Sequence, residues 1–247
     1  MTSTRRNPLA FLTVLIAAFS LLSDGTASAQ DFLEPTVTME DDQEGTDVLA
    51  VVAESMKLLL LEHGTRIAFQ DKTRRELGGN FWRDYRRSVR IPGQWEDTDP
   101  WWVNYVGHPI HGAAAGYLWL DHEPGAPADM SLSRKYWSSR GRAMAWAAAY
   151  SLQFEIGLLS EASIGNVGLR PETTGWVDHV VTPVGAFGLI VAEDALDRYL
   201  VRWVESRVRN RVARATLRLV LNPGRTLSNT ASGRPPWDRT GRSLGWR

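Results

Sequence analysis

The sequence has 247 residues, and its 28 basic and 28 acidic side chains give a formal net charge of zero. It contains no cysteine, which excludes disulfides, thiolate metal sites and cysteine nucleophiles. Residues 31–47 carry seven acidic side chains and no basic one, whereas residues 198–247 carry twelve arginines and only two acidic side chains. The chain is therefore strongly polarised in charge although it is neutral overall.

The first 29 residues have the three parts of a secretory signal peptide. Two arginines precede an apolar run over residues 9–22, and a group of small residues ends at Ala29. This run of 14 residues is shorter than the roughly 20 that span a bilayer, which disfavours an uncleaved anchor. We predict cleavage after Ala29 and export to the periplasm or the envelope membrane.

The next two segments predict a flexible leader and a first helix. Residues 30–45 are acidic and have few large apolar side chains, so they cannot bury enough surface to offset the entropy of ordering. From Asp47 to Phe69 apolar residues recur at helical spacing, and Thr46 is a candidate N-cap. Residues 71–100 mix glycine, proline and charge, which predicts short helical pieces and loops.

Two further helices are predicted in the middle of the chain. One begins at His108 or Pro109 and ends near Leu120, and its glycines and alanines would allow a neighbouring helix to approach closely. The other runs from Ser133 to about Ser160 and is apolar at its centre. We interpret this second helix as buried in the protein or embedded in lipid.

The last predicted helix runs from near Pro183 to about Leu221, and its second half is basic and amphipathic. Arginines on its polar side are predicted to bind anionic lipid headgroups: Arg198, Arg202, Arg209 and Arg218. Residues 222–247 lack periodicity and predict an irregular tail. The predicted fold is all-α, a compact bundle of about four to six helices over residues 46–221 between the flexible leader and this tail.

Several ionisable residues stand in apolar surroundings, where a charge is costly to bury unless it is paired or binds a metal. The candidates for catalysis are His108, Glu155, Glu161, Asp178, His179 and Glu193. Glu155 is the clearest of them, because its sequence neighbours are apolar. The alternative is a set of structural hydrogen bonds or ion pairs with the many arginines, since such pairs perturb ionisable groups as active sites do.

His108 and His111 are also candidate metal ligands. Residues three apart share a helix face, so with a carboxylate from another helix they could bind an ion. Capping or packing histidines are the alternative, because this spacing occurs easily by chance. The sequence contains no HExxH motif, no Gly-x-Ser-x-Gly motif and no phosphate-binding glycine loop.

The eleven tryptophans allow two interpretations. Their amphipathic rings suit a membrane interface, and they suit core packing equally well.

Four segments follow one another in a specific order. They are residues 102–112 (WVNYVGHPIHG), 136–139 (YWSS), 154–165 (FEIGLLSEASIG) and 178–185 (DHVVTPVG). Taken together, they resemble a family of uncharacterised bacterial envelope proteins with a domain of unknown function. The resemblance names no reaction. It implies that one site or one buried network contains His108, Glu155, Glu161, Asp178 and Glu193.

Two functions follow as hypotheses. The first is a non-catalytic, membrane-associated envelope protein whose buried polar network holds its helices in register. The alternative is a membrane-surface hydrolase or transferase that acts on lipid or cell-wall material. Convergence of the candidate side chains in one open cavity would favour the alternative. Nucleic-acid binding is not expected of an exported protein, despite its arginine-rich tail.

Overall fold

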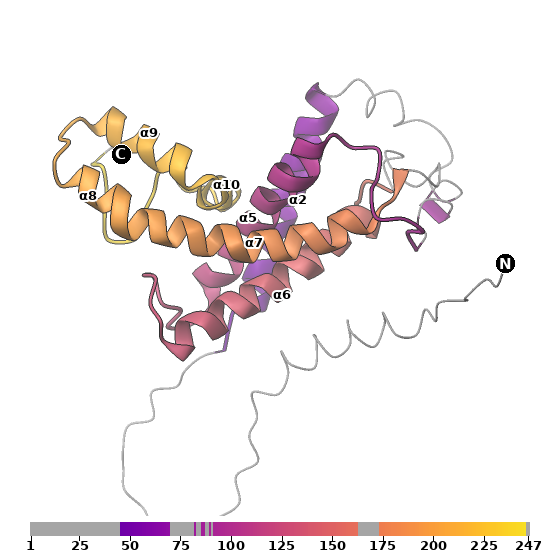
Figure 1. Ribbon diagram of the computed structural model, residues 1–247, viewed down its shortest axis with the longest axis horizontal. Helices are drawn as coiled ribbons and strands as arrows, with labels where there is room; N and C mark the ends of the chain where they lie inside the picture. The colour runs from indigo at the N-terminus through magenta and orange to yellow at the C-terminus, as the bar shows by residue number, and fades with distance from the viewer. Residues whose placement is uncertain are drawn as a thin grey trace, which may run out of the picture. The chain divides into compact units, whose positions relative to one another are not determined.

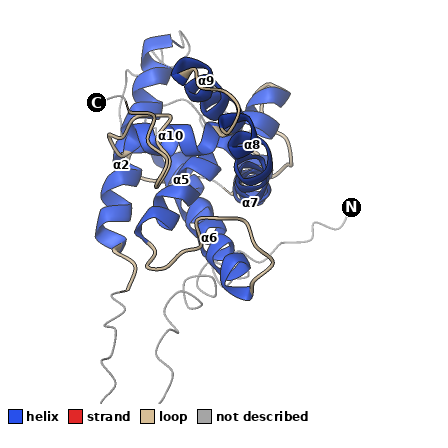
Figure 2. Cartoon of the chain, turned by 90° about the vertical axis from the view of Figure 1, so that its left-hand side faces the viewer, coloured by secondary structure: helices blue, strands red, loops and turns tan. Residues whose placement is uncertain are grey.

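The computed structural model describes residues 45–69, 82, 85, 86, 89, 91–162 and 173–245, and these form helices and loops without a strand (Figure 2). The main helices are α2 (Val48–Phe69), α5 (His108–His122), α6 (Arg134–Ile156), α7 (Trp176–Leu196), α9 (Arg211–Leu221) and α10 (Pro223–Ala231). A π-helical turn, η1 (Val103–Gly107), leads into α5, and another, η3 (Asp197–Val201), joins α7 to the short α8 (Arg202–Glu205). The predicted all-α bundle is confirmed. The predicted signal peptide and all but the last residue of the predicted leader lie outside the described residues.

Helix α5 lies at the centre of the bundle and packs against α7, α6, α10 and α2 (Figure 1). Its small residues permit the close approach that the sequence predicts. A Cβ atom on Gly112 would lie 2.7 Å from the carbonyl oxygen of Thr182, and one on Gly116 would lie 2.7 Å from Cδ1 of Ile190. A larger residue at either position would push α7 away from α5.

Helix α2 covers a second side of α5 and begins with a cap. The Asp47 carboxylate accepts a hydrogen bond from the Ala50 backbone N–H at 2.9 Å, so Asp47 is the N-cap and the prediction of Thr46 is wrong. The apolar core between α2, α5, α6 and α10 consists of Leu58, Leu59, Ala114, Ala115, Leu118, Tyr150, Phe154 and Ala231.

Helix α6 starts where the sequence predicts, because the Ser133 hydroxyl accepts a hydrogen bond from the Tyr136 N–H at 3.2 Å. It ends at Ile156, four residues before the predicted end at Ser160. After this helix the chain folds back, and the Glu161 N–H donates to the Phe154 carbonyl at 2.8 Å. This turn returns Glu161 to the end of the helix.

Helix α7 begins at Trp176, so the prediction of a start near Pro183 is wrong and the proline lies inside the helix. The reason is a tertiary contact that local sequence does not show. The backbone N–H groups of Trp176 and Val177 donate to the carbonyls of Gln94 and Trp95 at 3.1 and 2.9 Å, which satisfies donors in the first turn. The earlier start places Asp178 in that first turn.

The prediction of one helix up to Leu221 is also wrong, because α8 ends at Glu205 and α9 begins at Arg211. Asn210 caps α9 by accepting a hydrogen bond from the Ala213 N–H at 3.1 Å. The reversal brings Nε of Arg218 to 2.5 Å from the Glu205 carboxylate. Arg218 is fully buried there, so it does not face outward as predicted.

The other three arginines predicted to bind lipid lie at the surface or partly exposed. Arg198 donates to the Met130 carbonyl, and Arg202 pairs with Asp129. Arg209 is exposed. Lipid contact through these three side chains stays a prediction.

The prediction of an irregular tail is wrong for Pro223–Ala231, which form α10. This helix has no apolar periodicity of its own, and a carboxylate from α7 supports it. Glu193 accepts hydrogen bonds from the backbone N–H groups of Gly224 and Arg225 at 2.7 and 3.1 Å. From Ser232 to Gly245 the described chain has no helix.

Among the described residues, one helical stretch, Trp176–Glu205, is long and apolar enough to cross a membrane by length and composition. It carries the buried carboxylates of Asp178, Glu193 and Asp194, and α7 packs on α5. We therefore describe it as a helix of the bundle. Trp119 is buried, as core packing predicts, whereas Trp101 and Trp102 are exposed, and a membrane-interface role for them stays a prediction.

Candidate functional site

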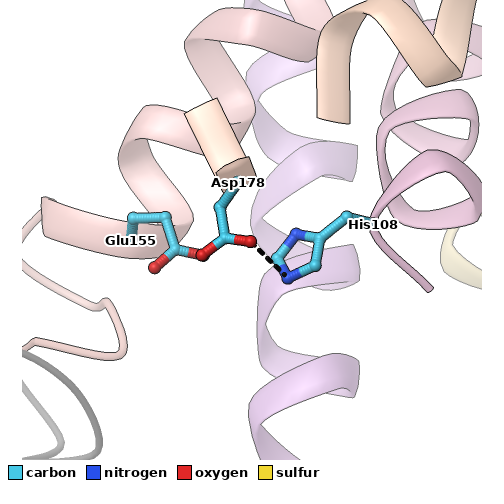
Figure 3. Close-up of side chains that lie close together, drawn as sticks. All are labelled: His108, Glu155 and Asp178. Carbon is cyan, nitrogen blue, oxygen red and sulfur yellow. Dashed lines mark ion pairs between the residues drawn. The ribbon is translucent and has the colours of Figure 1, made fainter. Parts of the chain in front are cut away.

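Three of the predicted residues meet at one place. His108 is the first residue of α5, Glu155 lies at the end of α6, and Asp178 lies in the first turn of α7. One ligand atom from each side chain lies within 4.8 Å of the others, and all three residues are buried. Asp178 lies between Glu155 and His108 (Figure 3). We call His108, Glu155 and Asp178 the Asp178 cluster.

Helix α7 fixes the His108 ring from both sides. Asp178 and Thr182 are four residues apart and share one helix face. The Asp178 carboxylate lies 3.3 Å from Nε2 of His108, and the Thr182 hydroxyl lies 3.1 Å from Nδ1. Burial, together with smaller contributions from the charges of His111 and Arg66, lowers the pKa of His108 to about 3. The imidazole is therefore neutral, and one of its nitrogens carries a lone pair.

Two carboxylates adjoin each other in this buried place (Figure 3). Burial raises the pKa of Glu155 to about 7, although the charge of Arg66 opposes the rise. Burial, the charge of Glu155 and the neighbouring Asp97 raise the pKa of Asp178 to about 10. Oxygen Oδ1 of Asp178, which lies 3.3 Å from Nε2 of His108, is buried and makes no hydrogen bond among the described residues. The pair therefore has room for a proton or a cation.

The segment before η1 supports Asp178. Asp97 bonds to the Asp178 side chain and accepts hydrogen bonds from the Asn104 amide at 2.7 Å and from the Asp99 N–H at 2.9 Å. A Cβ atom on Gly175 would lie 2.5 Å from the Trp95 carbonyl oxygen. Only glycine at this position lets the segment approach the start of α7 so closely.

His111 lies one turn beyond His108 on α5, with 5.9 Å between the ring centroids, and has different partners. Its Nδ1 lies 2.9 Å from one oxygen of Glu62, and the Tyr150 hydroxyl donates to the other oxygen at 2.9 Å. Nitrogen Nε2 of His111 is buried without a hydrogen-bond partner in the described part of the chain. A carboxylate that holds Nδ1–H leaves the lone pair on Nε2.

Among cations, Arg66 has the largest effect on the pKa of Glu155. It forms an ion pair with Glu161 and lies 5.7 Å above the Phe154 ring centroid. Burial lowers the pKa of Arg66, and the charges of Glu155 and Asp99 oppose that shift. Glu161 therefore joins the neighbourhood of the Asp178 cluster through Arg66 rather than through direct contact with His108.

An open pocket of about 390 Å³ lies beside the cluster and has mostly apolar walls. The residues that line it are Leu61, Glu62, Thr65, Arg66, Val103, Gly107, His108, His111, Phe154 and Leu227. Both histidines thus border the pocket, and Glu155 and Asp178 lie behind His108. Of the predicted site residues, His108 and His111 are the two that line this pocket, so convergence of all the candidates in one open cavity is not what its lining shows.

Two predicted candidates lie apart from the cluster. His179 is partly buried and packs its ring edge to face against Trp176, with 5.9 Å between centroids. Burial lowers its pKa. Glu193 caps α10, and its position fifteen residues after Asp178 corresponds to about 22 Å along α7. The single network that the resemblance implies is therefore divided between two places.

The second place is the Asp194 cluster, which we define as Tyr117, Tyr136, Arg140, Glu193 and Asp194. Asp194 accepts hydrogen bonds from the Tyr136 hydroxyl at 2.8 Å and from two guanidinium nitrogens of Arg140 at 3.0 and 2.6 Å. The Tyr117 hydroxyl is 3.4 Å from its other oxygen. Burial raises the pKa of Asp194, and Arg140 opposes the rise.

Sequence reasoning missed several residues of the site, among them Glu62, Asp97 and Thr182. Glu62 had a signal that could have been found, because it follows Leu58 and Leu59 on the buried face of α2. Asp97 lies in a loop, and Thr182 was assigned to the region before a helix. The role of Asp97 depends on its contact with Asp178 of α7, and the role of Thr182 on its contact with His108 of α5, and no local pattern shows either contact.

Comparisons with models of protein families, with curated proteins and with solved structures find no match to this chain. The resemblance to envelope proteins therefore stays a prediction.

Proposed function

We propose that this chain is a hydrolase whose catalytic centre is a divalent transition-metal ion bound by His108, Glu155 and Asp178. The observation that carries the proposal is their convergence, within 4.8 Å, beside an open pocket. One imidazole and two carboxylates form a donor set that suits Zn²⁺, Mn²⁺ or Fe²⁺. Two adjoining buried carboxylates also favour a cation, because it offsets their mutual repulsion.

The chain supplies the supporting contacts that such a centre needs. Thr182 holds Nδ1 of His108, which leaves Nε2 on the side of Asp178. Asp97 bonds to the Asp178 side chain, and the Asn104 amide in turn donates to Asp97. A bound divalent ion lowers the pKa of a coordinated water and polarises a carbonyl or phosphoryl oxygen.

His111 is the residue that we assign to proton transfer. Glu62 holds its Nδ1 in the tautomer that leaves Nε2 as an acceptor, and Tyr150 holds Glu62. His111 borders the pocket one helical turn from His108. A base in this position accepts a proton from the attacking water and returns it to the leaving group.

The hypothesis of a non-catalytic network fits the Asp194 cluster better than it fits the Asp178 cluster. Arginine and tyrosine donors surround Asp194, as expected of a structural ion pair. Asp178 instead adjoins another carboxylate. For the location we keep the cell envelope, which the signal-peptide pattern of residues 1–29 supports.

The test combines metal stoichiometry with hydrolysis. Purified mature chain is dialysed against Zn²⁺ or Mn²⁺, and the bound metal is measured by mass spectrometry. We expect about one ion per chain, none in Asp178→Asn, and a full complement in Glu193→Gln, a matched control on the same helix.

With metal bound, the chain should hydrolyse an activated ester such as p-nitrophenyl octanoate. His111→Gln should abolish turnover while it keeps the ion. Equal metal content in wild type and Asp178→Asn would contradict the metal centre, and full turnover in His111→Gln would contradict the assigned base.

A further inference from the structure

We infer that the pocket beside the Asp178 cluster binds an aliphatic chain, so that the substrate of the site is an amphipathic molecule with its polar end at His108 and His111. The reaction at that polar end rests on the proposed function. Binding of the aliphatic chain does not, and it is tested separately.

The walls of the pocket are apolar and come from four elements. Leu61 belongs to α2, Val103 to η1, Phe154 to α6 and Leu227 to α10. The volume of about 390 Å³ lies within the range of pockets that enclose small organic ligands. Apolar walls of this kind favour a ligand whose body has no hydrogen-bonding groups.

The polar side chains of the lining are largely occupied by protein partners. Both oxygens of Glu62 bond to His111 and Tyr150. Arg66 pairs with Glu161, and Nδ1 of His108 bonds to Thr182. Within the described lining, Nε2 of His111 and Nε of Arg66 are buried polar atoms that these bonds leave without a hydrogen-bond partner. A ligand that was polar throughout would therefore find few partners, whereas one polar end could be satisfied.

Exposed apolar side chains lie at or next to the pocket on two elements. Leu61 at the pocket is 38% exposed, and near Val103 of η1 the side chains of Trp102 and Val106 are 65% and 45% exposed. An aliphatic chain could enter past them either from a free amphiphile or from a bilayer lipid. The two sources share the same ligand chemistry, and the experiment separates them.

The first experiment is a fluorescence titration of the full mature chain with dansyl-undecanoate, below the concentration at which this probe forms micelles. Leu61→Glu places a carboxylate at the pocket and should raise the Kd at least about tenfold. Leu60→Glu is the matched control, because Leu60 is an exposed neighbour on α2 outside the pocket lining. It should leave the Kd within about twofold.

A second pair of variants fills the space instead of charging it. Val103→Trp adds bulk to the pocket wall and should weaken binding of the probe, whereas Val220→Trp, at an exposed position of α9 outside the lining, should not. Flotation with phosphatidylcholine vesicles then identifies the source. Loss of vesicle binding in Leu61→Glu alone indicates a bilayer lipid, and probe binding without vesicle binding indicates a free amphiphile.

Three outcomes would overturn the inference: absence of probe binding, equal effects of Leu60→Glu and Leu61→Glu, or loss of binding in Met56→Glu alone. The last outcome would place the chain in the apolar groove of about 210 Å³ between α2 and α6, which Met56 lines. Repeating the titration with EDTA separates the two proposals. Probe binding without metal binding contradicts only the metal centre, and metal binding without probe binding contradicts only the aliphatic ligand.

Discussion

The two ends of α7 carry buried carboxylates in opposite settings. At the carboxyl-terminal end, Asp194 accepts hydrogen bonds from Arg140 and Tyr136, so each buried charge has a partner. At the amino-terminal end, Asp178 adjoins Glu155, and its buried oxygen Oδ1 faces Nε2 of a neutral imidazole at 3.3 Å without a hydrogen bond among the described residues. The arginine and tyrosine donors assign the Asp194 cluster to structure, whereas the adjoining carboxylates of the Asp178 cluster are the ones for which we propose a ligand.

Two acidic residues of α7 that look equivalent in the sequence have different contacts in the structure. Asp178 and Glu193 are both acidic residues in an apolar helix. Glu193 accepts backbone hydrogen bonds from the first turn of α10, and burial raises its pKa to about 7 while those bonds oppose the rise. Glu193 therefore stabilises the first turn of α10, a helix with weak intrinsic propensity. Asp178 instead contacts the side chains of His108 and Asp97 and adjoins Glu155.

The largest expected effect comes from breaking the Asp194 cluster. Asp194→Ala should lower the free energy of unfolding by about 3 to 5 kcal/mol, because it leaves the buried Arg140 guanidinium uncompensated. Urea denaturation measures the change. Asp129→Ala is the control, since Asp129 pairs with Arg202 at the surface and should cost no more than about 1 kcal/mol. Equal costs would remove the distinction between buried and surface pairs.

The approach of α5 to α7 should be nearly as sensitive. Gly112→Ala should cost about 1 to 3 kcal/mol, because the added Cβ meets the Thr182 carbonyl at 2.7 Å. Gly188→Ala on α7 meets nothing within 4 Å and should instead stabilise the protein by up to about 1 kcal/mol. Thermal unfolding of the two variants gives the comparison. A neutral Gly112→Ala would show that the helices pack less tightly than described.

Removing a carboxylate from the Asp178 cluster should raise the free energy of unfolding, whereas removing Asp194 should lower it. The pKa of Glu155 is raised to about 7 and that of Asp178 to about 10 in the folded protein, so without a cation these two groups make the folded state bind more protons than the unfolded state from about pH 4 to 10. Stability therefore falls as the pH rises through this window.

Glu155→Gln should remove the part of that fall that Glu155 contributes and, in EDTA at pH 8, stabilise the protein by about 1 to 2 kcal/mol. Urea denaturation at pH 5 and pH 8 measures it. A variant that is less stable than wild type at pH 8 would show that Glu155 is a structural partner like Asp194.

The smallest effect concerns the start of α2, far from both clusters. Asp47→Ala should cost about 1 kcal/mol through loss of the cap on Ala50, whereas Thr46→Ala should stay within about 0.5 kcal/mol. Thermal melts of both variants decide between the two caps. The opposite ranking would restore Thr46 as the N-cap.

The sequence predicted those parts of the fold that local periodicity determines. Helices α2 and α6 have caps of their own, α5 begins at a proline-containing first turn without a side-chain cap, and the positions of all three follow the prediction closely. Helix α10 does not, because its glycine, serine and asparagine have weak helix propensity and its cap comes from Glu193. The early start of α7 likewise depends on carbonyls of Gln94 and Trp95.

The site was predictable to the same degree. His108, Glu155 and Asp178 stood out because each is ionisable and has apolar neighbours, and that pattern survives in one chain without any alignment. Their partners Glu62 and Thr182 are ordinary residues for their helices. Which candidates meet depends on how α5, α6 and α7 pack, and no property of a single helix reports it.

Crystals of the mature chain soaked in Mn²⁺ or Zn²⁺ and measured by anomalous diffraction provide the most direct test of the metal centre. We expect one strong anomalous peak about 2.0 to 2.2 Å from Nε2 of His108 and from carboxylate oxygens of Glu155 and Asp178. A map without a peak there, in which the two carboxyl groups share a short hydrogen bond, would contradict it and assign the cluster to structure.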